Sequence, residues 1–82
     1  MRTTIDYQAE VIRAREGIAK ARTSYDGGDW KTARDEAEEQ LKSLRDIENP
    51  LDETSRDKYL LSIKALILSA DAIKQASEEE LR

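Results

Sequence analysis

The sequence predicts an all-α protein: an antiparallel up-down-up bundle of three helices, formed by a single domain of residues 1–82. Three observations predict it. Ala, Leu, Ile, Glu, Lys and Arg dominate the composition, which is typical of helices. Apolar residues recur at intervals of three and four in three stretches, at about 4–26, 30–48 and 54–76. Two short breaks separate the stretches, and short links favour antiparallel neighbours.

The first helix is expected to begin near Thr3 or Thr4, because Thr3 and Asp6 have the spacing of an acidic capping box. Its core positions share one face and are Thr4, Tyr7, Val11, Ala14, Ile18, Ala21 and Tyr25, with Ile5, Ile12 and Ala19 expected to widen that face. Gly17 is a weak point that costs about 1 kcal/mol relative to Ala.

The segment Asp26-Gly27-Gly28-Asp29 is expected to end the first helix and to cap the second. The inward positions of the second helix are Trp30, Ala33, Ala37, Leu41, Leu44 and Ile47. Its outer side carries an acidic face of Asp35, Glu36, Glu38 and Glu39, with basic residues at pairing distance. We interpret these charges as solubilising.

Asn49-Pro50 ends the second helix. Whether residues 50–53 form a separate turn before a start at Thr54 or Ser55 stays open. The third helix carries two apolar stripes. The expected core stripe is Tyr59, Ile63, Leu66, Ala70 and Ile73, and the stripe opposite, called the outer strip below, is Leu61, Ala65, Leu68 and Ala72. A small domain usually covers one such stripe, so the outer strip is either an interface or is buried by a different rotation of the bundle.

The helix junction resembles the centre of a tetratricopeptide repeat, in which a Gly, a small polar residue, an aromatic residue and then an Ala pack two helices together. Gly28, Asp29, Trp30 and Ala33 match that pattern. Most of the chain also resembles a microtubule-interacting and trafficking (MIT) domain, a three-helix bundle of about this length. Ser69-Ala70-Asp71-Ala72-Ile73-Lys74 partly matches the pattern that ends its third helix. The MIT resemblance implies peptide binding in a groove beside the third helix.

The sequence predicts no enzyme, because the residues of common active sites are missing. Histidine and cysteine are absent, which removes the commonest general base and the thiolate ligands. Asp26 and Asp29 could supply two carboxylates to a cation, but a turn with a cap explains them. We therefore predict no catalytic, cofactor-binding or metal-binding residues, and no small-molecule substrate.

The net charge of -4 is unevenly distributed, with +2 in residues 1–25, -6 in residues 26–53 and zero in residues 54–82. The acidic middle argues against direct nucleic-acid binding, which needs a basic face. Arg13, Arg15, Lys20 and Arg22 are interpreted as a solvated face, with a phosphate contact as the alternative. The first residues lack a signal peptide and the apolar run around Leu66 is too short to span a bilayer, so a cytoplasmic protein is predicted.

These observations favour a small non-catalytic protein-interaction module that uses the outer strip, a helical groove or the acidic second helix. Its partner is another protein or a second copy in a homodimer. The alternative is a small inhibitor of the kind that phages and mobile elements encode, a decoy whose acidic face blocks a nucleic-acid-binding partner. An apolar contact should persist at high salt, whereas a charge decoy should dissociate.

Overall fold

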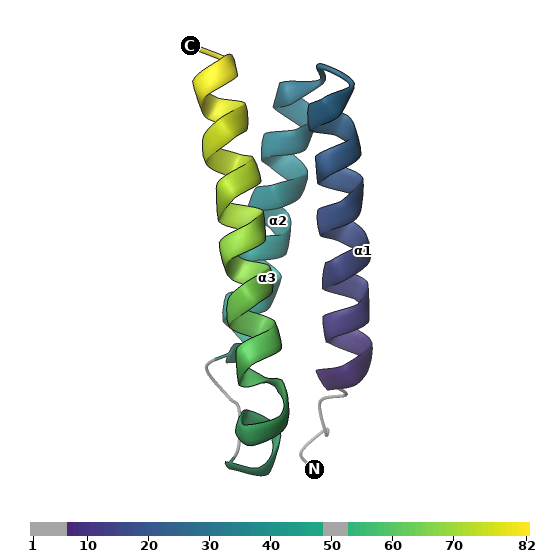
Figure 1. The fold of residues 1–82 in the computed structure, drawn as a ribbon, viewed down its shortest axis with the longest axis vertical. Coiled ribbons are helices and arrows are strands. Elements are labelled where there is room, and N and C mark those ends of the chain that lie inside the picture. Colours follow the sequence, from purple (N-terminus) through teal and green to yellow (C-terminus); the bar gives the residue numbers. More distant parts are fainter. Residues whose placement is uncertain (1–6, 49–52) are drawn as a thin grey trace.

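The computed structural model describes residues 7–48 and 53–82 and consists there of three helices, α1 (Tyr7–Asp26), α2 (Trp30–Glu48) and α3 (Glu53–Glu80). The helices lie side by side and alternate in direction, and each contacts both others (Figure 1). The bundle is elongated, with extents of 44 × 19 × 17 Å. The predicted all-α three-helix bundle is therefore confirmed. The predictions for residues 1–6, including the Thr3–Asp6 capping box and Ile5, and those for Asn49 and Pro50 lie outside the described residues.

The junction between α1 and α2 is a Schellman turn. The Asp29 N–H donates to the Ser24 carbonyl at 2.9 Å, and the Gly28 N–H donates to the Tyr25 carbonyl at 3.0 Å. Gly28 adopts the left-handed backbone that this turn requires, with φ of +83°. Asp29 then caps α2, because its carboxylate accepts the Thr32 N–H at 3.3 Å. The turn thus uses its residues as the sequence predicts.

The core follows the predicted stripes of the three helices, with one exception in α2: Trp30, predicted to point inward, is partly exposed and does not belong to the core. Its buried residues are Tyr7, Val11, Ala14, Ile18 and Ala21 from α1; Ala33, Ala37, Leu41, Leu44 and Ile47 from α2; and Ile63, Ala70 and Ile73 from α3. Tyr25, Tyr59, Leu60, Leu66 and Ile67 pack against this core while partly exposed. The rings of Tyr7 and Tyr59, 6.0 Å apart between centroids, join α1 to the first half of α3.

Two predicted core positions of α1 are wrong. Ile12 is 46% exposed, and Ala19 is also exposed. Ile12 lies two residues from the buried Ala14, which places it about 200° round the helix and away from both neighbours. The core face of α1 is therefore narrower than its apolar composition indicates.

The third helix continues to Glu80, so its predicted end near residue 76 is wrong. The reason is the next core position, Ser77, which is fully buried four residues after Ile73. Lys74 supports the same turn, with its ammonium 3.9 Å from the Glu78 carboxylate. Among the described residues, no helix has the length and apolar character that crossing a membrane requires.

Gly17 is explained by a neighbour on α2. A methyl group at this position would overlap the side-chain amide of Gln40. The glycine therefore makes room for a long polar side chain between α1 and α2, where a small residue would otherwise be expected. Gly17 has a low helix propensity, but it allows α1 to pack against Gln40 of α2.

Candidate functional site

The outer strip of α3 faces solvent along its whole length. Leu61 is 81% exposed and Leu68 is 70% exposed. Ala65 and Ala72, between and after them, are exposed as well. The alternative in which a rotated bundle buries this strip is therefore wrong. Two large apolar side chains remain uncovered on one helix of the chain.

The rotation of α3 follows from two of its fully buried positions. Ile63 and Ala70 have no exposed surface. Each lies two residues after a leucine of the outer strip, so Leu61 and Leu68 project about 160° away from the bundle axis. Intervals of four, three and four residues keep the strip on one side of the helix. The strip is thus a continuous apolar ridge and not a scatter of single residues.

A shallow hollow adjoins the strip at the end of α3 that lies near the turn. It has a volume of about 230 Å³ and is lined by Arg22, Tyr25, Asp26, Ala72, Ile73 and Ala76; we call it the α1–α3 hollow. Alanines at 72 and 76 leave this space, because a methyl group cannot reach across to α1. Ala72 belongs both to the outer strip and to the hollow, so the two form one surface.

The charges beside the strip change sign along α3. Lys58 and Lys64 are exposed in the first half of the helix, and Asp71 and Glu79 lie in the second half. The Lys58 ammonium lies 5.4 Å from the centre of the Tyr59 ring. The Asp71 carboxylate accepts a hydrogen bond from the Gln75 amide at 2.8 Å. The strip therefore has a basic half and an acidic half.

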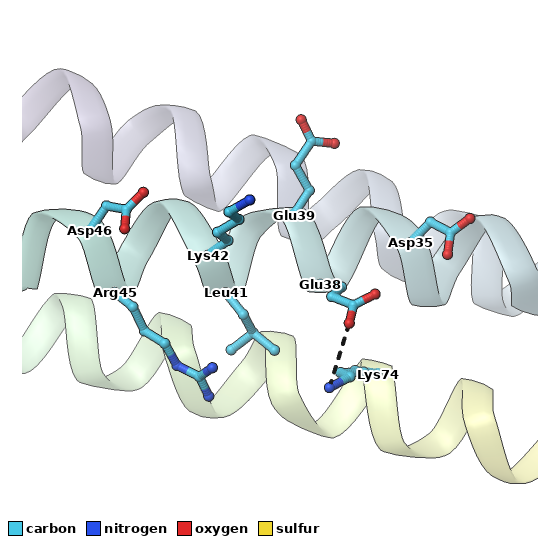
Figure 2. Close-up of a pocket in the computed structure, with 8 residues that line it drawn as sticks. All are labelled: Asp35, Glu38, Glu39, Leu41, Lys42, Arg45, Asp46 and Lys74. Carbon is cyan, nitrogen blue, oxygen red and sulfur yellow. Dashed lines mark ion pairs between the residues drawn. The ribbon is translucent and has the colours of Figure 1, made fainter.

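The predicted acidic face of α2 is divided between two sides of the helix. Glu36 turns toward α1, where its carboxylate accepts the Ser24 hydroxyl at 2.8 Å. Asp35, Glu38 and Glu39 line a groove of about 690 Å³ between α2 and α3. Figure 2 shows Lys42, Arg45 and Lys74 among them, with Glu38 paired to Lys74 at 3.9 Å. The groove is of mixed charge.

The acidic side chains of the described ranges do not assemble into a metal site. Across residues 7–48 and 53–82, no cluster of three or more carboxylate side chains could hold a metal ion. Asp26 and Asp29 are both exposed, and Asp29 is used as the helix cap.

Sequence reasoning missed two polar features of the helix contacts. The Ser24–Glu36 hydrogen bond links α1 to α2 near the turn, and no local pattern signals it because the residues are twelve apart. Ser77 is fully buried, and its hydroxyl has no hydrogen-bond partner among the described residues. Its spacing from Ala70 and Ile73, seven and four residues, was the available signal.

Comparison with protein-family models, with curated proteins and with solved structures gives no match to this chain.

Proposed function

We propose that this chain is a small non-catalytic protein-interaction module that binds its partner through the outer strip of α3. The observation that carries the proposal is the exposure of Leu61 and Leu68 on one continuous ridge. Soluble monomers seldom leave a contiguous apolar surface of this kind uncovered. The alanines that alternate with the leucines favour a helix as the opposing element, because small residues let two helices approach closely.

The strip supplies a useful but limited binding energy. Full burial of a leucine side chain stabilises a contact by about 1.5–3 kcal/mol. With 81% and 70% of their surfaces still exposed, Leu61 and Leu68 together retain roughly 2–4.5 kcal/mol of this gain. Association costs several kilocalories per mole. A partner must therefore also use the surroundings of the strip, namely the α1–α3 hollow and the flanking charges.

The resemblance to MIT domains supports the same class of function. It implies a partner segment in a groove beside the third helix, and α3 borders both the α1–α3 hollow and the groove it shares with α2. The decoy alternative has less support, because Lys42, Arg45 and Lys74 interrupt the acidic face that would imitate a nucleic acid.

The test is affinity capture with two matched double variants. Leu61→Gln with Leu68→Gln removes the apolar strip without adding charge, and glutamine keeps a good helix propensity. Ile12→Gln with Leu81→Gln removes the two other large apolar side chains that are exposed among the described residues, at 46% and 43%. Each protein is immobilised and exposed to an extract of the cells that produce it.

We expect the parent and the control variant to retain a bound protein in 1 M salt. The strip variant should fail to bind it. Equal capture by all three proteins would refute the strip as the binding surface. A partner that is released from the parent by salt alone would favour the decoy instead, since exposed charge contacts are screened at high ionic strength.

A further inference from the structure

The outer strip is self-complementary when a second copy of α3 is laid against it in the opposite direction. We infer that the partner is a second copy of this chain, bound through an antiparallel α3–α3 contact about a two-fold axis near residues 67 and 68. The inference rests on the proposed function, because it names the occupant of the same strip. A two-fold interface requires that each residue i meets a residue j whose own partner is i.

The charges beside the strip satisfy this requirement in the antiparallel arrangement. Lys64 and Asp71 lie on the same flank of α3, seven residues apart. An axis midway between them places Lys64 of each copy opposite Asp71 of the other. Lys58 and Glu79 have nearly the same midpoint and form a second reciprocal pair. A parallel arrangement would instead place Lys64 against Lys64 and Asp71 against Asp71.

The apolar residues share this axis. The strip from Leu61 to Ala72 is centred within about 2 Å of the midpoint of Lys64 and Asp71, at a rise of about 1.5 Å per residue. Leu68 of one copy then meets Ala65 and Leu68 of the other. Leu68 therefore has a small residue opposite it beside the second leucine, which lets the two helices approach closely.

The α1–α3 hollow completes the fit. In the same register, Leu61 of the second copy lies across Ala72 and beside Ala76, the two alanines that open the hollow. The hollow has a volume of about 230 Å³, which is ample for one leucine side chain. Each copy therefore supplies a leucine and receives one. This explains why an exposed leucine lies at one end of the strip and a hollow at the other.

Sedimentation velocity of the full chain tests self-association. The contact is small, so it is measured from about 10 μM to about 1 mM, which spans the weak range expected for small interfaces. The parent is expected to shift from monomer to dimer within this range. Leu68→Gln should weaken the dimer by at least about tenfold, and the control Ile12→Gln should leave it unchanged. Far-UV circular dichroism verifies that each variant is folded, and Leu61→Gln replaces Leu68→Gln if the latter is not.

A charge exchange tests the pairing. Lys64→Glu is expected to weaken the dimer about tenfold, because it creates two repulsive pairs with Asp71 across the axis. Adding Asp71→Lys to the same chain restores the attraction and should recover the parent's dimer. An effect of Lys64→Glu that Asp71→Lys fails to reverse would overturn the register.

Disulfide formation tests the direction, and the chain is suited to it because it contains no cysteine. Lys58 and Ala76 lie on one flank and are symmetric about the axis. A mixture of Lys58→Cys and Ala76→Cys proteins should oxidise to the mixed disulfide. In each protein alone the two sulfur atoms would lie more than about 20 Å apart, at a rise of about 1.5 Å per residue. Rapid disulfide formation by Lys58→Cys alone would indicate a parallel dimer and overturn the inference.

The two proposals fail separately. A parent that stays monomeric at 1 mM overturns the dimer, and the proposed function then stands if the capture experiment still finds a strip-dependent partner. A monomeric parent with no strip-dependent capture overturns both.

Discussion

The two adjacent glycines of the α1–α2 turn should respond to alanine with opposite signs. Gly28 has φ of +83°, in the left-handed region, and a methyl group there would meet no atom within 4 Å. The cost of Gly28→Ala is therefore conformational alone, about 1–2 kcal/mol for a side chain in left-handed geometry. Gly27 lacks a positive φ, and its methyl group would lie 3.4 Å from the Thr23 carbonyl oxygen, in ordinary contact. Gly27→Ala should stabilise by about 0.4–1 kcal/mol, since it restricts the unfolded chain.

The difference between the two variants is thus about 1.5–3 kcal/mol, which corresponds to roughly 6–24 °C in melting temperature for a domain of this size. Urea and thermal unfolding followed by circular dichroism measure it. All variants are compared at one low protein concentration, because self-association would raise the melting temperature. Gly28→Asn is the internal control and should lose less than Gly28→Ala, because asparagine tolerates left-handed geometry better. If Gly27→Ala and Gly28→Ala destabilise equally, the assignment of the turn is wrong.

Three further predictions concern helix packing and are measured by urea unfolding. Gly17→Ala should raise the free energy of unfolding by less than the roughly 1 kcal/mol expected from helix propensity, because the methyl group displaces the Gln40 amide. Adding Gln40→Ala should recover the missing part of this gain. If the effects of the two substitutions are strictly additive, the contact between Gly17 and Gln40 is contradicted. Ser77→Ala should stabilise by about 1 kcal/mol, because a buried hydroxyl without a partner is removed; a loss would reveal a hydrogen bond. Ile63→Ala should destabilise by about 2–5 kcal/mol while Leu61→Ala changes stability by less than about 0.5 kcal/mol, and similar losses would contradict the assigned rotation of α3.

Most of the fold could be predicted from local sequence patterns, because most of these patterns are compatible with one structure only. Gly28 and Asp29 define a turn whose hydrogen bonds stay within residues 23–29, so the sequence around them was sufficient. The stripe of α2 is regular and its opposite side is charged, which leaves one orientation for the helix. For α3 the sequence left two orientations, since both sides are apolar, and the tertiary contacts of Ile63 and Ala70 were needed to decide between them.

The incorrect or missed predictions concern positions whose environment depends on a neighbouring helix. Ile12 is apolar, but no helix faces it, because α2 and α3 both lie toward the side of Ala14 and Ile18. Ser77 is polar, yet it is fully buried, because it shares the face of α3 on which Ala70 and Ile73 pack into the bundle. Gly17 is unfavourable within its own helix and favourable only opposite Gln40. Sequence periodicity describes one helix at a time, and these three outcomes depend on pairs of helices.

The two sides of α3 differ in apolar width, so one side contributes to folding and the other is available for binding. The inward side carries the buried residues Ile63, Ala70 and Ile73, and Tyr59, Leu60, Leu66 and Ile67 pack against the core while partly exposed. The outer strip has no such apolar edges, since Lys58, Lys64 and Asp71 flank it. The bundle therefore buries the wider side, and the folded monomer gains little from Leu61 and Leu68, which keep 81% and 70% of their surfaces exposed. Substitutions in the strip should consequently change association without changing the stability of the monomer, which is the behaviour expected of an interface and not of a core.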